Sequence, residues 1–469
     1  MNGRANEPRF EAAGIAAAMA REEVRFTETH PKSKALAERA AANWLTGAPM
    51  SWMREVPSPF PVFAEGAKGS VLRDVDGIEY ADLCMADTGA LAGHSPQPVA
   101  DAIALRAANG MTLFAPTEDA ARVGEELARR FGLPVWQSAI TATDANRFCI
   151  AFARQITGRA KVLVFHGCYH GSLPEAAVSL DASGKPVGRL KVYGPAGDPA
   201  LSARCVEQND LAALERELSF GDVACVLAEP CLTNVGMVPP AEGWHEGLRE
   251  LTRKHGALLI LDETHTICAG PGGCTKAWGL EPDMLTLGKS IAGGVPVAVY
   301  GFSDGTAKRA RIAMEQFGGW GVGVVGSTLA GNALQMAALR ATLEHVMTEA
   351  NFARKMIPTA EYFVSKISSL IDDFGLPWQA RNLGARAEYT FLPEAPRNGS
   401  EAMAAANRPL EQLIHLFLLN RGVLTTPFYN VVLCAPSTTE AQVNRYAEGL
   451  AECLGELAAG AEPHGAKTP

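Results

Sequence analysis

A carboxylate and a lysine that each follow a short apolar run are the residues of this chain best suited to chemistry. Asp262 ends the apolar run at residues 258–261, and Lys289 follows the run at residues 284–287 between two small residues. An ammonium group is expensive to bury, so a lysine in such a site favours its neutral, nucleophilic form and makes Schiff bases. A carboxylate is the partner that the ring nitrogen of a pyridinium cofactor requires. The pair therefore indicates pyridoxal phosphate (PLP), whereas the ordinary alternative is that both residues cap helices or face water.

Three further segments carry groups that could bind such a cofactor. Small and hydroxyl residues at 141–146 precede a helix expected over residues 146–157, and a helix start suits a phosphate, although simple N-capping is the alternative. Tyr169, in a segment with two glycines, could stack on a flat ring or pack within its loop. Glu229, which follows another apolar run, could hydrogen-bond near the oxygen side of the cofactor or cap the next turn.

The elements expected to position these residues form an α/β fold. Short runs that are apolar throughout, at residues 161–165, 223–228 and 257–261, alternate with amphipathic helices between about residues 97 and 345. Strands that are apolar on both faces predict a mostly parallel sheet covered by helices on both sides. Ligands of such sheets bind at the carboxyl ends of the strands, where the candidate residues lie.

The remainder of the chain predicts a smaller α+β domain. Helical spacing marks residues 9–46, and alternation around an Asp-Gly turn at residues 76–77 predicts a β-hairpin. We therefore expect residues 1–80 to be N-terminal helices and a hairpin that join the small domain. Residues 81–345 are expected to form the large cofactor-binding domain, and residues 346–469 the C-terminal small domain.

Composition excludes several classes of function. The 469 residues carry a net charge of −9, which argues against nucleic acid as a main partner. The sequence has no apolar stretch of about 20 residues and no apolar core near its N-terminus, so we expect a cytoplasmic protein without a membrane partner. The ten cysteines lie mostly in apolar runs and are expected to be reduced thiols. His265, Cys268 and Cys274 lie close in sequence, but without a CxxC pair we expect no metal site.

Six motifs, in one order along the chain, resemble those of class III aminotransferases, the family that contains ω-amine transaminases and glutamate-1-semialdehyde aminomutase. The likeness extends from the hairpin near residue 76 to the C-terminal domain and implies PLP fold type I. The motifs are the cup at residues 141–146, Tyr-His-Gly at 169–171, Glu-Pro at 229–230, Asp-Glu-x-x-Thr at 262–266, Gly-Lys followed by Gly-Gly at 288–294, and Ser-Thr-x-x-Gly-Asn at 327–332.

This resemblance implies roles around the cofactor ring. Lys289 would hold PLP covalently and then move the proton between the substrate carbon and the cofactor, and Asp262 would pair with the pyridinium nitrogen. Thr264 would lie against one face of the ring, with Tyr169 near the other. His265 stands where the family usually has glutamine, near the phenolic oxygen of the ring.

The resemblance also implies how the phosphate is bound. Ala142 and Thr143 would donate hydrogen bonds to it. Thr328 would reach the phosphate of a neighbouring subunit, so a homodimer is implied. Ala142 replaces the glycine of the family's cup and Asp144 replaces its glutamate, which puts the detailed geometry of phosphate binding in question.

Substrate recognition is less clear from the sequence. Arginine binds carboxylates bidentately, and Arg54 and Arg386 are the two candidates for binding the substrate carboxylate. Arg54 loosely resembles the carboxylate-binding arginine of β-amino acid transaminases. The alternative for each is an ion pair, with Glu55 or Glu388. Phe428 stands where some relatives carry an arginine, and with Trp52 it could favour an aryl or alkyl substituent.

The leading hypothesis is a PLP-dependent transaminase that moves an amino group from an amine or a β/ω-amino acid to a keto acid such as pyruvate. The first alternative is an aminomutase of the glutamate-1-semialdehyde type. The second is a non-catalytic PLP-fold binding protein, but such proteins often lose the lysine, whereas Lys289, Asp262 and Thr328 are all present here.

Overall fold

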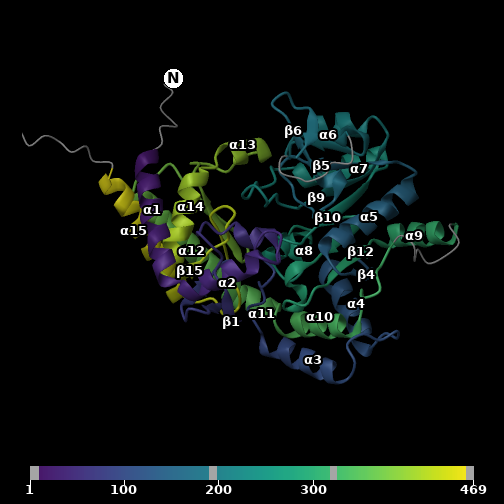
Figure 1. The fold of residues 1–469 in the computed structure, drawn as a ribbon. Coiled ribbons are helices and arrows are strands. Elements are labelled where there is room, and N and C mark those ends of the chain that lie inside the picture. Colours follow the sequence, from purple (N-terminus) through teal and green to yellow (C-terminus); the bar gives the residue numbers. More distant parts are fainter. Residues whose placement is uncertain (1–9, 190–197, 317–324, 461–469) are drawn as a thin grey trace, which may run out of the picture.

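The computed structural model describes residues 10–189, 198–316 and 325–460. A seven-stranded sheet forms the larger part of the molecule, and the N-terminal and C-terminal helices lie together in the smaller part (Figure 1). The large sheet has, in spatial order, β4 (Val135–Ala139), β12 (Ala298–Phe302), β11 (Met284–Leu287), β10 (Leu258–Asp262), β9 (Val223–Ala228), β5 (Lys161–Phe165) and β8 (Ala203–Val206). In this sheet β12 runs opposite to the other six strands, which share one direction, so the expected mostly parallel sheet is confirmed.

The central strands are buried on both faces because successive side chains enter different cores. In β5, Val162 and Val164 pack into the core beneath α5 (Ala142–Thr157), whereas Leu163 and Phe165 pack into the core beneath α6 (Leu211–Leu218) and α7 (Trp244–His255). This alternation explains why the strands read as unbroken apolar runs. The other helices of this part are α3 (Gln97–Ala108), α4 (Glu118–Phe131), α8 (Gly273–Ala277), α9 (Asp304–Gln316) and α10 (Ala333–His345).

Helix α5 begins four residues before the expected start at residue 146, which corrects that expectation. Thr141 is its N-cap, and the Thr141 hydroxyl accepts a hydrogen bond from the backbone N–H of Asp144 at 3.1 Å. The alanine at residue 142 therefore has helical geometry and does not require the freedom of a glycine.

The smaller part packs helices from both ends of the chain around two small sheets. Its helices are α1 (Ala12–Thr29), α2 (Pro31–Ala41), α11 (Glu349–Asn351), α12 (Ile357–Asp373), α13 (Gly399–Ala404), α14 (Arg408–Leu419) and α15 (Glu440–Gly460). The first sheet is β13 (Gln379–Leu383), β14 (Arg386–Thr390) and β16 (Val431–Leu433). The second is β1 (Ala64–Lys68), β2 (Val71–Asp74), β3 (Glu79–Asp82) and β15 (Val423–Leu424). The hairpin of β2 and β3 was expected, whereas the parallel pairing of β15 with β3 was not. Helix α1 packs on α14 and α15. The expected domain boundaries, at residues 80/81 and 345/346, stay a prediction.

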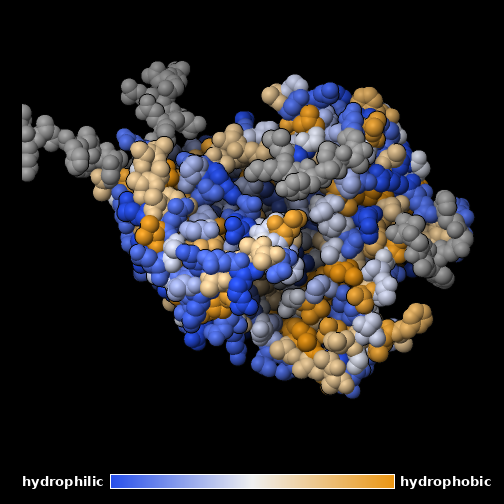
Figure 2. Space-filling model, in the orientation of Figure 1, coloured by the Kyte–Doolittle hydropathy of each residue, from blue (hydrophilic) through white to orange (hydrophobic). Residues whose placement is uncertain are grey.

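The described residues differ from what a membrane-spanning helix, a metal site or a disulfide would require. Among the described residues, no helix is long and apolar enough to cross a membrane, and no group of three or more potential ligands could hold a metal ion. All ten cysteines are free and buried. Apolar side chains gather over the region of α3 and α10 (Figure 2), and the exposed ones after α3 include Met111, Leu113 and Phe114.

Candidate active site

A cavity of about 550 Å³ lies at the carboxyl ends of β9, β10 and β11, next to the start of α5. It brings together eight of the nine residues that the sequence predicted to contact the cofactor. Five lie at the ends of strands β9, β10 and β11 or just after them, namely Glu229, Asp262, Thr264, His265 and Lys289. Three come from α5 and from the loop after β5, namely Ala142, Thr143 and Tyr169. Thr328, the ninth, is exposed and does not line the cavity.

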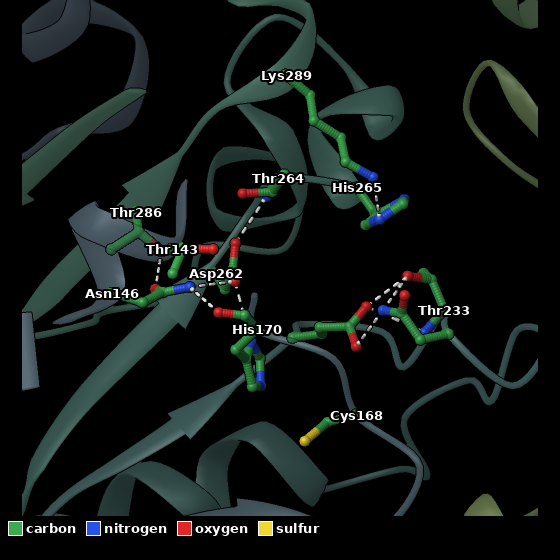
Figure 3. Close-up of polar contacts among 12 residues, drawn as sticks. Thr143, Asn146, Cys168, His170, Thr233, Asp262, Thr264, His265, Thr286 and Lys289 are labelled. Carbon is green, nitrogen blue, oxygen red and sulfur yellow. Dashed lines mark hydrogen bonds and ion pairs between the residues drawn. The ribbon is translucent and has the colours of Figure 1, made fainter. Parts of the chain in front are cut away.

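Asp262 ends β10 and is buried as a carboxylate that accepts three hydrogen bonds (Figure 3). It accepts hydrogen bonds from Asn146 Nδ2 at 2.8 Å, from His170 Nδ1 at 2.9 Å and from the backbone N–H of Thr264 at 3.0 Å. Burial acts to raise the pKa of Asp262, but these donors, His170 first, outweigh it and lower the pKa to about 2. Asp262 is therefore ionised near neutral pH.

The partners of Asp262 were not assigned roles by sequence reasoning. Asn146 is fully buried on α5, where its Nδ2 also donates to the backbone carbonyl of His170 at 3.2 Å and its Oδ1 accepts from Thr286 Oγ1 at 2.6 Å. The sequence did offer one sign of this role, because Asn146 is a polar residue on the apolar face of the helix. Buried amide side chains usually form hydrogen bonds, so a partner could have been expected.

Lys289 follows β11 and opens a short 3-10 helix in a left-handed conformation, with φ of 56°. Its Nζ donates to Asp87 Oδ2 at 2.8 Å and lies 2.7 Å from His265 Nε2. Burial, and then the charge of Lys289, lower the pKa of His265 to about 3, so the imidazole is neutral. Because an ammonium only donates, Nε2 accepts from Lys289, and Nδ1 donates to Thr88 Oγ1 at 3.2 Å. The lysine is thus held by one anion and one neutral ring.

Asp87 was not identified from the sequence. It lies in a run of four non-glycine residues, 85–88, with φ between 45° and 76°. A left-handed backbone conformation costs a non-glycine residue about 1–2 kcal/mol of conformational free energy. The run is held at its start by Asp82, whose Oδ1 accepts from the backbone N–H groups of Cys84 and Met85 at 2.9 Å each. Asp82 Oδ2 also accepts from His94 Nε2 at 2.7 Å, which ties the far end of the loop to the same carboxylate.

The start of α5 and the loop after β5 form a cradle with little free space. The Thr143 hydroxyl accepts from the backbone N–H of Ser172 at 3.3 Å. A Cβ on Gly171, whose φ is 89°, would lie only 2.0 Å from Thr143 Oγ1, so glycine is required there. The first turn of a sixteen-residue helix, α5, offers backbone N–H groups and the positive end of its dipole at this cradle.

Three side chains around the remaining wall differ in what they can offer. Thr264 Oγ1 is buried and has no hydrogen-bond partner among the described residues. Tyr169 is 48% exposed, so its ring is available to a ligand. Glu229 accepts from the backbone N–H of Thr233 at 3.1 Å and from Asn234 Nδ2 at 3.0 Å, and burial raises its pKa. Glu229 therefore caps the next turn, one of the two roles considered for it, while also lining the cavity.

The structure separates the four residues expected to bind substrate. Arg386 is buried on β14, where Nη2 donates to the backbone carbonyl of Thr233 at 3.0 Å and lies 3.8 Å from Glu388 Oε2. Within the described residues its Nε and Nη1 atoms have no partner. The ion pair with Glu388, the alternative considered for Arg386, is thus present, although it is buried and not at the surface, and two donors of Arg386 have no partner among the described residues. None of the four residues lines the cavity: Arg386 is buried, Arg54 is exposed, and Trp52 and Phe428 are half-buried.

Three comparisons with known proteins agree with this geometry. A crystal structure described as a glutamate-1-semialdehyde-aminomutase from Pseudomonas aeruginosa PAO1 has a TM-score of 0.94 and 48% identity, covering 96% of this chain and 100% of that chain. A β-phenylalanine aminotransferase from Variovorax paradoxus has a TM-score of 0.83 and 26% identity, covering 95% of this chain and 98% of that one. Glutamate-1-semialdehyde 2,1-aminomutase 2 of Exiguobacterium sibiricum is 33% identical over 86% of this chain and 91% of its own length.

The sequence profile described as aminotransferase class-III matches residues 53–454. Together with the α/β architecture and the structural neighbours, this match confirms the expected PLP fold type I. The chain belongs to the class-III aminotransferase family.

Proposed function

We propose that this protein is a PLP-dependent aminomutase that exchanges an amino group and an oxo group between neighbouring carbons of a small carboxylate, as in glutamate 1-semialdehyde. The observation that carries the proposal is the 48% identity to a structure described as a glutamate-1-semialdehyde-aminomutase over 96% of the chain. This choice replaces the transaminase reading that the sequence had placed first.

The residues of the cavity fit PLP. Asp262 is ionised and buried, which suits a protonated pyridine nitrogen, and the cradle at Thr143 and Gly171 suits a phosphate. Thr264 and Tyr169 both line the cavity, where they would contact a flat ring. When bound, PLP supplies an electron sink that makes a proton on the adjacent substrate carbon removable.

The described side chains divide the remaining work. Lys289 would carry the proton between substrate carbons, because its nitrogen is the basic atom that projects into the cavity beside a neutral His265. Asn146 and His170 would keep Asp262 charged and oriented through their hydrogen bonds. Burial of Asp262 away from water strengthens its interaction with a cationic ring nitrogen.

Arg386 would bind the single carboxylate of the substrate. Its guanidinium has two unpartnered buried N–H atoms, and unpartnered buried donors call for an acceptor. Burial raises the pKa of Asp87 and lowers that of His265. After the larger effect of Lys289, the Arg386 guanidinium lowers the pKa of both groups, so its charge acts on these two residues. A ligand carboxylate would complete its hydrogen bonding in bidentate fashion.

A homodimer would complete the assembly. Exposed apolar residues after α3, at Met111, Leu113 and Phe114, form a surface that a second copy would cover. Thr328 is exposed, as it must be to contact a neighbouring site. Ultracentrifugation of Leu113→Asp should show a shift from dimer to monomer with loss of activity, and an active monomeric wild-type protein would contradict the assignment.

The mutase proposal is tested with glutamate 1-semialdehyde as the sole substrate. The purified, PLP-loaded protein should form the isomer with exchanged amino and oxo groups, without an added amino donor or keto acid. Lys289→Ala, loaded in the same way, is the matched control for uncatalysed isomerisation. A requirement for pyruvate, with alanine as a product, would instead establish transamination, the second candidate, which the likeness to the β-phenylalanine aminotransferase supports.

A further inference from the structure

The carboxylate of Asp87 is held beside Lys289 by a segment that the fold keeps in an unfavourable conformation. Four consecutive L-residues, 85–88, have positive φ. Hydrogen bonds from both ends of the loop to Asp82 fix this run. Strained segments that the surrounding structure holds in place cluster at ligand sites, so the position of Asp87 calls for a functional explanation.

Asp87 has one direct hydrogen-bond donor among the described residues, the Lys289 ammonium at 2.8 Å. The two side chains are 29% and 28% exposed, and the cavity is lined by Lys289 and by Ala86, the residue before Asp87. The other charged or titratable groups that act on Asp87 are His265, which is neutral, and the Arg386 guanidinium. Among the described residues, the Asp87 carboxylate therefore accepts a hydrogen bond from one flexible cation, the Lys289 ammonium.

That cation is not available to Asp87 while the Lys289 nitrogen holds PLP. Once the Lys289 nitrogen is bonded to PLP, it no longer presents the three donors of a free ammonium. A partly buried carboxylate that loses its cationic donor still carries the free-energy cost of its burial. It therefore binds another cationic donor favourably. An amino-bearing substrate enters as an ammonium ion and offers the same donors.

We propose that Asp87 is a substrate-binding residue that accepts a hydrogen bond from the substrate ammonium group, in the place that the Lys289 ammonium takes in this structure. The inference rests on the proposed function in requiring a substrate that carries both an amino group and a carboxylate. Asp87 and Arg386 then hold opposite charges of one molecule, which fixes the orientation of the carbon chain between them.

The test measures binding without turnover. Lys289→Ala is loaded with 4-deoxypyridoxine 5-phosphate, which has a methyl group in place of the PLP aldehyde and cannot react with amines. Calorimetric titrations then compare 4-aminopentanoate with pentanoate, which differ only in the amino group. The same titrations are repeated after adding Asp87→Asn, Asp87→Glu or, as a matched surface control, Asp101→Asn on α3.

We expect 4-aminopentanoate to bind about tenfold more tightly than pentanoate, the size of a partly buried charge pair. Asp87→Asn should reduce this preference to less than about twofold while leaving pentanoate unchanged, and Asp87→Glu should restore part of it. Asp101→Asn should have no effect. Equal weakening of both ligands by Asp87→Asn would mean that Asp87 only supports the loop, and would overturn the proposal.

Absence of any preference before the Asp87 change, absence of binding by 4-aminopentanoate, or a preference that survives Asp87→Asn would each overturn it as well. Because no product is formed, the result is independent of whether the enzyme is a mutase or a transaminase. Failure of the proposed function would appear only in the product assay with glutamate 1-semialdehyde.

Discussion

Replacing Asp262 by asparagine should slow proton removal from the substrate without unfolding the protein. The carboxylate accepts three hydrogen bonds, from Asn146, His170 and the N–H of Thr264. Its pKa of about 2, against an ordinary value near 3.8, shows that these contacts favour the charged form in spite of burial. A shift of this size corresponds to roughly 2–3 kcal/mol.

The substitution removes that charge while keeping the size of the side chain. A neutral amide cannot favour protonation of a ring nitrogen, and its NH₂ group would face the donors of Asn146 and His170. If the lost charge interaction is worth roughly 3–4 kcal/mol in the buried site, the rate should fall about 100- to 1000-fold. The assay is single-turnover absorbance spectroscopy of the PLP-loaded protein mixed with substrate.

Asp283→Asn provides the matched control. Asp283 forms a two-pronged ion pair with Arg249, at 2.7 and 3.0 Å, in the same domain but outside the cavity. Its loss should lower the melting temperature and leave the single-turnover rate within about twofold of the wild type. An Asp262→Asn rate within twofold of the wild type, with full cofactor occupancy, would refute the role of Asp262.

Three further outcomes follow from the site. Lys289→Ala should abolish turnover while circular dichroism and the melting temperature stay close to the wild type, since its side chain is 28% exposed; residual steady turnover would contradict this. Arg386→Ala should lower kcat/KM for carboxylate substrates by roughly 30- to 4000-fold, for a loss of about 2–5 kcal/mol, whereas Arg54→Ala should not; equal effects on a carboxylate-free amine would contradict it. The pKa of His265 is lowered to about 3 from about 6.5 in the unfolded chain. Its contribution to stability is therefore complete above pH 6.5 and is lost as the pH falls toward 3. His265→Gln should flatten that part of an acid denaturation curve, and an unchanged slope would exclude the buried neutral ring.

The sequence predicted the large sheet well because each buried strand is apolar on both faces. Residues 161–165 and 223–228 read as continuous apolar runs and form β5 and β9 with those bounds. The pairing of β15 with β3 was missed because it joins segments more than 300 residues apart and β15 has only two residues. Local patterns carry no signal for such a contact.

The candidate site was predicted unevenly for a similar reason. Most of the residues predicted to contact the cofactor stand at strand ends or at the start of α5, where motif and chain position coincide, and eight of the nine line one cavity. Asp87 was missed because its contact with Lys289 spans 202 residues and its left-handed backbone has no glycine to mark it. Asn146 contacts Asp262 across 116 residues, so its role became visible only in three dimensions.

Chemical trapping of the cofactor tests the central claim most directly. The PLP-loaded protein is reduced with borohydride, digested and analysed by mass spectrometry to locate the phosphopyridoxyl group. We expect the modification on Lys289, and we expect Lys289→Ala to remain unlabelled under the same conditions. Labelling of a different lysine, or equal labelling of the Lys289→Ala variant, would contradict the assignment of this cavity as the PLP site.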